Sequence, residues 1–404
     1  MSDQDNSENE FEVTEESWFS RIWKSIKGVG LGFLMFVGAF YLIHWNEGRA
    51  LQTYQSLDEG LGAVVSIDAS TIHDNNNEKL VHMSGLASSD EELVDEPFNL
   101  SVNALQLFRT VEMYQWEETL SKKTKEKVGG GTTTTKEIKY DKVWSAELID
   151  SSDFKSKKSD KQNPKKFSFE TVTKTAANVR LGAFTIPSDM VEGLDNSADV
   201  ELTDTNIPSE SKDRMHLEDD GIFVGSDPSR PEIGDMRIRF SKTPATEVTI
   251  VAQQDGDTFT PYETDAGDSL VMIKQGKLNA NEMFEDAKSE NSIMTWILRA
   301  CAIAAMCAGL KMMLLPIAVV ADFIPFVGGI MALGVSLVCG VVGVSLSLLT
   351  IGMSWVSYRP MIGIPLLVVP TIALFVLIKK RRRRSTPDQQ KPAAEAIEAP
   401  ATEA

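Results

Sequence analysis

Cysteine and histidine are scarce in this chain, and their positions exclude disulfide-stapled and metal-bound folds. The three cysteines are Cys301, Cys307 and Cys339; all lie inside apolar blocks, so no disulfide framework can hold the polar part together. The four histidines are scattered without the short spacing of a metal site, and no cysteine lies outside the apolar blocks to join them. We therefore expect neither a metal nor another cofactor.

Catalytic motifs are missing as well. The serines lack a Gly-x-Ser-x-Gly elbow. The glycines at 129–131 lack the Lys-Ser or Lys-Thr that completes a phosphate-binding loop. Adjacent acids such as Glu91 and Glu92 are more often solvated than catalytic. Nothing in the sequence requires an enzyme, and we expect a non-enzymatic protein.

The excess of acidic residues argues against nucleic acid as a partner. The net charge is −18, and residues 47–291 alone carry 46 acids against 27 bases. Nucleic-acid-binding proteins need an excess of Lys and Arg for the phosphate backbone. A local exception is the segment 122–166, which has 13 lysines against 7 acids. This segment is either a solvated face or a binding patch.

Long apolar runs divide the 404 residues into a membrane part and a polar part. The first run, 28–45, is long enough to cross about 27 Å of hydrocarbon. It follows Arg21, Lys24 and Lys27 and lacks a cleavage site, which indicates an uncleaved anchor. Three further spans are expected at about 296–320, 328–355 and 360–378. The fold class is therefore a membrane protein with four transmembrane α-helices, one N-terminal and three C-terminal, and a large β-rich (α+β) extramembrane domain.

The charges that flank the runs predict the topology and the domain boundaries. Residues 1–20 are an acidic, disordered tail, 21–46 the basic lead and first span, and 47–291 the soluble domain on the non-cytoplasmic side. Residues 292–378 hold the other spans, and 379–404 a basic run and a disordered tail. The basic run predicts a cytoplasmic C-terminus and contact with anionic lipid, and consists of Lys379, Lys380, Arg381, Arg382, Arg383 and Arg384.

Strand signals dominate residues 47–291. Side chains alternate between apolar and polar most clearly in Met236, Ile238 and Phe240, and a hairpin tip is expected at 129–131. One helix, Ala280–Ser289, leads into the second span, with Asn279 as its cap. The expected strands are Ala63–Ile67, Leu80–Met83, Ala104–Gln115, Lys136–Trp144, Phe167–Thr173, Met236–Phe240, Glu247–Val251 and Leu270–Ile273.

Small residues recur every four positions in the second and third spans. Such rows let helix backbones approach closely in lipid, where no hydrophobic drive brings helices together. The rows are candidates for helix packing and self-association, although small residues are also common in membrane helices generally. They consist of Ala300, Ala304 and Ala308, and of Ala332, Ser336 and Gly340, a row that Gly343 and Ser347 continue.

Four ionisable residues fall at membrane depth: Arg299, Lys311, Asp322 and Arg359. Such residues are functional candidates by default. Lys311 and Asp322 share a helix face but stand about 16 Å apart along a straight helix, so they cannot pair there. The alternative is that Arg299, Asp322 and Arg359 lie at the membrane interfaces and only Lys311 is buried.

Several motifs resemble the LUMA (transmembrane protein 43) family. After the first span stand Asn46, Glu47, Gly48, Arg49 and Ala50. The other motifs are the segments 111–116, 234–237, 295–296, 298–300 and 358–360, and the resemblance runs from about residue 18 to 378. It implies four spans and a large domain in the lumen of the endoplasmic reticulum or the perinuclear space. In animal members it also implies residence at the inner nuclear membrane, self-association, and binding of lamins and emerin.

The compartment depends on the source. Members of the family also occur in bacteria, and the alanine- and proline-rich tail fits a bacterial member with a periplasmic domain in the inner membrane. The resemblance carries no catalytic residue. Three hypotheses follow: a multi-pass scaffold that self-associates and organises the bilayer or other membrane proteins, a channel or transporter formed by the C-terminal spans, and an enzyme with a site in the soluble domain. We favour the scaffold.

Overall fold

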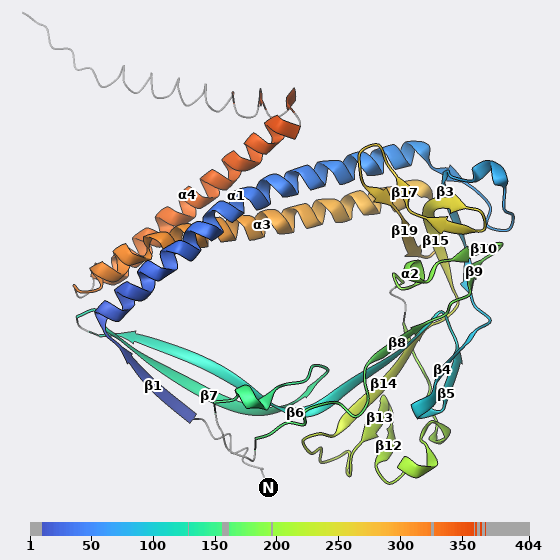
Figure 1. Cartoon of the computed structure of the whole chain (residues 1–404), viewed down its shortest axis with the longest axis horizontal. Coiled ribbons are helices and arrows are strands. Elements are labelled where there is room, and N and C mark those ends of the chain that lie inside the picture. Colours follow the sequence, from blue (N-terminus) through green and yellow to red (C-terminus); the bar gives the residue numbers. More distant parts are fainter. Residues whose placement is uncertain are drawn as a thin grey trace, which may run out of the picture.

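The chain folds into a ring with a helical arm and a β-sheet arm (Figure 1). The computed structural model describes residues 10–127, 129–155, 161–194, 197–324 and 327–358, and beyond these only 360, 361, 364, 365 and 368. Three long helices form the helical arm: α1 (Trp18–Ala63), α3 (Ala280–Ala321) and α4 (Val327–Tyr358). A fourth and short helix in the described part, α2 (Ser188–Val191), lies beside the sheets.

The three long helices contain the first three expected spans. Among the described residues, α1, α3 and the Gly329–Tyr358 part of α4 are long and apolar enough to cross a membrane. The expected cap of α3 is confirmed: Asn279 accepts from the backbone N–H of Glu282 at 3.0 Å, and the Glu282 carboxylate accepts from that of Asn279 at 2.9 Å. The fourth expected span, 360–378, lies almost entirely outside the described residues, and the basic run 379–384 lies wholly outside them.

The expected boundaries at 47 and 291 are not structural boundaries. Both α1 and α3 continue through them without a break, as polar helices that reach the sheets. Leu57 of α1 and Phe284 of α3 are buried there against Leu80, Val251 and Leu270 of the sheet arm. Hydropathy indicates where a helix leaves the membrane. It does not indicate where the helix ends, because packing against the sheets keeps the polar part of each helix folded. The same two helices therefore belong to both parts of the molecule.

Two sheets, antiparallel except for one parallel strand pair, form most of the other arm. In the described part, the larger sheet has the strand order β1-β7-β6-β14-β13-β12, with β11 beside β14 and β8 beside β6. Its strands are β1 (Glu10–Glu16), β6 (Gln106–Glu126), β7 (Thr132–Ser145), β8 (Val172–Thr175), β11 (Ala198–Asp199), β12 (Met215–Glu218), β13 (Gly221–Val224) and β14 (Met236–Thr243).

The smaller sheet has the order β10-β9-β3-β15-β16, with β19 beside β15 and β2 parallel to β3. Its strands are β2 (Val65–Ser66), β3 (Leu80–Ser88), β9 (Val179–Leu181), β10 (Phe184–Ile186), β15 (Thr246–Asp255), β16 (Thr258–Thr260) and β19 (Met272–Gln275). Two short pairs complete the described strands: β4 (Glu92–Asp95) with β5 (Leu100–Asn103), and β17 (Tyr262–Glu263) with β18 (Ser269–Leu270).

One apolar core joins the two sheets. Met236, Ile238 and Phe240 of β14 all point into it, which confirms the alternation read from the sequence. Met83 of β3 and Ile250 of β15 enter the same core from the smaller sheet. Every strand expected from the sequence overlaps an observed one. The soluble part is therefore β-rich, as expected.

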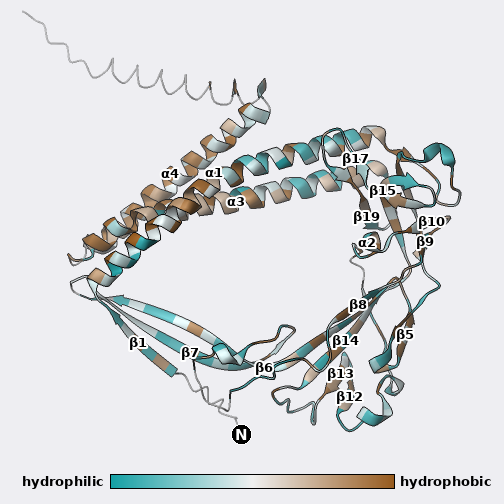
Figure 2. Ribbon diagram, viewed as in Figure 1, coloured by the Kyte–Doolittle hydropathy of each residue, from teal (hydrophilic) through white to brown (hydrophobic). Residues whose placement is uncertain are grey.

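A long polar ribbon, formed by β1, β7 and the distal half of β6, returns from the sheets to the start of α1 (Figure 2). Its hairpin tip includes residues 129–131, where the sequence predicts it, and Gly129 and Gly130 have positive φ angles of 90° and 78°. A Cβ atom on Gly130 would lie 2.5 Å from the ring of Trp18. Glycine is thus required at the tip both by its backbone conformation and by its contact with α1.

The prediction of a disordered tail over 1–20 is wrong for residues 10–20. Residues 10–16 form β1, which pairs with β7 over seven positions, and α1 begins at Trp18. The acids of β1 meet lysines of the ribbon: Glu12 pairs with Lys136 at 2.9 Å, and Glu15 with Lys127.

Acid should loosen β1 from β7. A hydrogen bond from Lys136 and its positive charge lower the pKa of Glu12. The carboxylate therefore stabilises the paired state above its unfolded pKa, and this contribution is lost as the pH falls through the lowered pKa. We expect smaller hydrogen-exchange protection factors for residues 132–138 at pH 3 than at pH 7. Lys136→Gln should weaken this pH dependence and Lys139→Gln should not; equal protection at both pH values would contradict the ion pairing.

Candidate functional site

Glu47 lies at a junction where all three long helices meet. Its carboxylate is 5% exposed and accepts two hydrogen bonds from Arg299 of α3, at 2.7 Å from Nε and 2.8 Å from Nη2. The indole nitrogen of Trp355 on α4 donates to the same carboxylate at 2.7 Å. The guanidinium of Arg299 also lies over the ring of Trp296, 4.8 Å from its centroid. One buried carboxylate therefore binds α3 and α4 to α1 at the end of their apolar parts.

The neighbouring motif residues fix how α1 lies against α3. Asn46 is fully buried, and its amide donates to the carbonyl of Thr295 at 3.1 Å. Arg49, one turn further on, donates to the side chains of Asn291 at 3.0 Å and Thr295 at 3.1 Å. Asn291 in turn donates to the carbonyl of Ala50 at 2.9 Å. Residues three or four apart share a helix face, so these pairs set one register between the helices.

Gly48 gives α4 room to approach α1. A Cβ atom there would lie 2.7 Å from the hydroxyl oxygen of Tyr358. Tyr358 stacks on His44, with 5.1 Å between the ring centroids, and its hydroxyl lies 3.1 Å from His44 Nε2. His44 Nδ1 lies 3.1 Å from the hydroxyl of Ser354. Each of the four residues Asn46, Glu47, Gly48 and Arg49 thus has a distinct contact at the junction.

A cleft of about 170 Å³ opens beside the junction. Glu47, Lys288, Asn291, Trp296, Trp355 and Tyr358 are among its lining residues. Its charges are already paired, since Glu47 binds Arg299 and Lys288 lies 3.3 Å from Asp58 and 3.4 Å from Glu285. Within the described residues, no three His, Cys, Asp or Glu side chains are grouped to hold a metal ion. The contacts of these residues join the three long helices to one another.

A second polar contact closes the opposite end of the bundle. Arg21 of α1 forms an ion pair with Asp322 at 2.6 Å, and the Asp322 side chain is 6% exposed. Arg21 also donates to the carbonyl of Gly130 at the hairpin tip, and the Trp18 indole donates to the carbonyl of Val319 at 2.8 Å. The start of α1, the end of α3 and the tip of the ribbon are therefore bound together.

The structure reverses the expected burial of the charges at membrane depth. Arg299 and Asp322 each form an ion pair with a residue of α1 and have side chains that are 13% and 6% exposed, whereas Lys311 is exposed on α3. Lys311 makes no contact with Asp322, and it has no hydrogen bond or ion pair within the described part of the chain. Arg359 lies outside the described residues. The partners of Arg299 and Asp322 are Glu47 and Arg21, which precede them in the chain by about 250 and 300 residues.

Of the small residues at the tightest helix crossings, Gly343 continues the predicted row on α4, whereas Gly32 and Gly309 lie outside the predicted rows. A Cβ atom on Gly309 would lie 2.7 Å from the carbonyl oxygen of Gly32, and one on Gly343 would lie 2.6 Å from the sulfur of Cys307. By contrast Ala300, Ala304 and Ala332 are exposed, and Ala308, Ser336 and Gly340 are half-buried. Ala300, Ala304 and Ala332 therefore lie outside the crossings within one chain, whereas the carbonyl of Gly340 accepts from the Cys307 thiol at the crossing of α3 and α4, at 3.8 Å. Glycine inside an apolar helix was the signal that could have found the true crossings.

Removing one partner of the Glu47–Arg299 pair should destabilise the helical arm. We expect Glu47→Gln to lower the free energy of unfolding by about 3–5 kcal/mol, because the Arg299 guanidinium, whose side chain is only 13% exposed, loses its counter-charge. The double variant Glu47→Met with Arg299→Met should lose less free energy of unfolding than the sum of the losses in Glu47→Met alone and Arg299→Met alone. Thermal unfolding in detergent micelles, followed by circular dichroism, measures both.

The matched control for that prediction is Glu285→Gln. Its carboxylate is exposed and 3.4 Å from Lys288, so its loss should change stability by less than about 1 kcal/mol. Equal melting temperatures for Glu47→Gln and Glu285→Gln would show that the junction does not stabilise the helices.

Comparison with known proteins identifies the family. The family model described as Transmembrane protein 43 matches residues 113–360. Transmembrane protein 43 of Homo sapiens is 32% identical over 381 residues, which are 92% of this chain and 93% of that protein. The Mus musculus protein is 33% identical over 363 residues, covering 86% and 90%. The Drosophila melanogaster homolog is 28% identical over 274 residues, covering 66% and 70%. No solved structure matches. The resemblance read from the motifs is confirmed, and the chain belongs to the transmembrane protein 43 family.

Proposed function

We propose that this membrane protein is a scaffold that self-associates through an open strip on α3. The strip consists of Ala300, Ala304, Ala308 and Lys311, which follow one another on one side of the helix. Ala300, Ala304 and Lys311 are exposed, and Ala308 is half-buried. The family and the apolar helices establish a membrane protein; the open strip supports the further step to a scaffold.

Lys311 is the observation that carries the proposal. It lies within the apolar part of α3, and within the described residues it has neither a hydrogen bond nor an ion pair. A lysine that faces lipid costs about 2.5–3.5 kcal/mol on insertion scales unless it reaches the interface or a polar partner. The alanines beside it would let the backbone of a second helix approach and offer its carbonyl oxygens. A second copy of the chain thus provides both close packing and acceptors.

The row on α4 has the same character. Ala332 is exposed, and a Cβ atom on Gly340 would meet nothing within 4 Å. Ser336 donates to the carbonyl of Ala332 in its own helix at 2.8 Å, so it does not need a polar partner elsewhere. Most of the apolar stretch of each long helix is left uncovered by the chain itself. The bundle therefore offers two smooth faces to neighbours.

The alternative of a channel or transporter gains no specific support. A conducting path needs polar groups that face an aqueous lumen. The hydroxyls of Ser347, Thr350 and Ser354 on α4 instead donate to carbonyls four residues earlier in their own helix, at 2.8–2.9 Å.

The proposed partners are the bilayer, a second copy and other membrane proteins. In a eukaryotic cell the proposed location is the endoplasmic reticulum and inner nuclear membrane, where lamins and emerin are the expected partners. In a bacterium it is the inner membrane. The basic run 379–384 is proposed to hold the C-terminus against anionic lipid. No enzymatic role, cofactor or nucleic-acid partner is proposed.

Replacing small residues of these rows by leucine should weaken the oligomer without unfolding the chain. We expect Ala304→Leu and Gly340→Leu to raise the dissociation constant in mild detergent about tenfold, which corresponds to about 1.4 kcal/mol of lost contact. Both side chains point into space that is free within one chain, so the melting temperature should stay near that of the wild type. Light scattering measures the mass, and circular dichroism the melting temperature.

Two controls separate contacts between copies from contacts within one chain. Val344→Leu enlarges an exposed apolar side chain outside the rows and should leave the mass unchanged. Gly309→Leu should lower the melting temperature, because its Cβ would clash with the backbone of Gly32. If Ala304→Leu and Gly340→Leu both had the oligomer mass of the wild type by light scattering, self-association through these faces would be overturned.

A further inference from the structure

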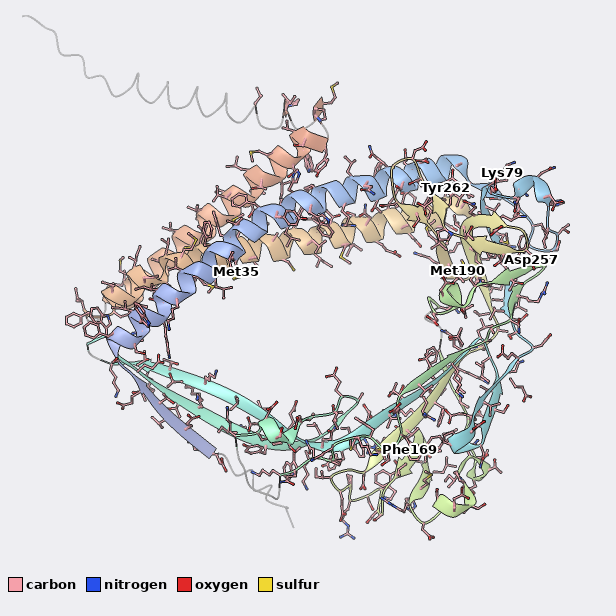
Figure 3. The ribbon with its side chains drawn as sticks, in the orientation of Figure 1. Met35, Lys79, Phe169, Met190, Asp257 and Tyr262 are labelled. Carbon is pink, nitrogen blue, oxygen red and sulfur yellow. The ribbon has the colours of Figure 1, made fainter. Side chains whose placement is uncertain are left out.

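The cleft beside the Glu47 junction lies where the apolar parts of the helices end. Along α1 it lies between Met35, in the apolar run 28–45, and the contact with Tyr262, where α1 and α3 reach the sheets (Figure 3). Helix α4 ends at Tyr358, whereas α1 and α3 continue side by side beyond it (Figure 1). The cleft therefore opens at the height of the lipid head groups, where α4 no longer fills the groove between the other two helices.

Aromatic side chains line the cleft as they line a membrane surface. Trp296 of α3 is 64% exposed, and Tyr54 of α1 is 44% exposed. Trp355 and Tyr358 of α4 form a third wall. Such rings favour the layer of the lipid head groups, because each has an apolar body and one polar group. The aromatic lining thus agrees with the depth that the apolar runs indicate.

Two cations of the cleft lining keep donors that the described part of the chain does not use. Arg299 binds Glu47 through Nε and Nη2, and its Nη1 has no hydrogen bond within the described residues. The Nζ atom of Lys288 lies 3.3 Å from Asp58 and 3.4 Å from Glu285, two exposed carboxylates outside the cleft lining. An ammonium group has three N–H donors. Both cations can therefore bind an anion in the cleft without giving up their ion pairs.

The two cations lie at different depths. Arg299 is bound to Glu47, whereas Lys288 Nζ lies 5.4 Å from the ring centroid of Tyr54. Glu47 and Tyr54 are seven residues apart on α1, which is about 10 Å along the helix axis. One phosphate cannot bridge this distance. A ligand that uses both cations needs a phosphate at its inner end and a second polar group at its outer end, where the exposed Ser292 hydroxyl also lines the cleft.

We propose that the cleft binds the head group of an anionic phospholipid from the surrounding bilayer. The phosphate accepts from Nη1 of Arg299, the outer part of the head group contacts Lys288 and Ser292, and the acyl chains continue into the bilayer. The described residues beyond α4 leave the cleft open, since Met361 is 89% and Ile364 51% exposed. The proposal requires the membrane location of the three helices and is independent of self-association.

Native mass spectrometry of the full chain, titrated with phosphatidylglycerol in mild detergent, tests the charge of the site. We expect Lys288→Gln to raise the dissociation constant of the first bound lipid about tenfold, because one charge-assisted contact is lost. The matched control is Lys274→Gln. Lys274 also pairs with two carboxylates, Asp286 at 3.3 Å and Glu290 at 2.8 Å, but it lies outside the cleft lining, so the dissociation constant should not change.

A second pair of variants tests the position of the site. Ser292 and Ile293 are neighbours with exposed side chains, and of these two only Ser292 lines the cleft. We expect Ser292→Trp to fill the cleft and abolish tight binding of phosphatidylglycerol, and Ile293→Trp to retain it. Because both side chains are exposed, both variants should melt near the wild-type temperature without added lipid.

Three outcomes would overturn the proposal. The first is an unchanged dissociation constant for phosphatidylglycerol in both Lys288→Gln and Ser292→Trp. The second is equally tight binding of phosphatidylcholine, whose head group ends in a positive charge, because the site would then not select an anionic lipid. The third is displacement of the lipid by millimolar glycerol 3-phosphate, which would assign the cleft to a soluble phosphate.

Discussion

The buried ion pair between Glu47 and Arg299 is the interaction on which the helical arm depends. A charge in an apolar surrounding must be paired, and the pairing leaves little freedom in how the helices cross. With α1 and α3 fixed at this point, Gly32 meets Gly309 further along the bundle and Arg21 reaches Asp322 at its end. With Trp355 on the same carboxylate, α4 is fixed as well. The register of the arm then determines where the ribbon can attach.

Much of this arrangement could be read from the sequence, but only as separate parts. The apolar runs located the long helices, alternation located the strands, and the glycines located the hairpin tip. Glu47 stood out through a motif and Arg299 through its depth in an apolar run, yet nothing in a single sequence joins residues so far apart. The spacing of four that suggested Ala300, Ala304 and Ala308 identifies a helix face without saying what covers it. Gly32, Gly309 and Gly343 cross closely because of packing that only the assembled bundle defines.

The N-terminal strand shows how composition misleads when pairing is non-local. Residues 10–16 have four acids, and such a segment cannot bury enough apolar surface to order by itself. The role of the lysine-rich segment 122–166 was ambiguous because its positive charges had no partner nearby in the sequence. Together they compensate each other, since Glu12 and Glu15 bind Lys136 and Lys127. Hydropathy also placed boundaries at 47 and 291, where α1 and α3 merely pass from an apolar to a polar surrounding.

The continuity of α1 and α3 has a mechanical consequence. With 46 residues, α1 is about 69 Å long at a rise of 1.5 Å per residue, and it has no break between its apolar and polar halves. A stiff rod of this length works as a lever, so a small change of tilt at one end becomes a large displacement at the other. The ribbon contacts the start of α1, and the sheets pack against its other end. Because both ends of the helix are held, its tilt cannot change freely. Bending of the surrounding bilayer would instead load these contacts, and the stress would appear at the hairpin tip.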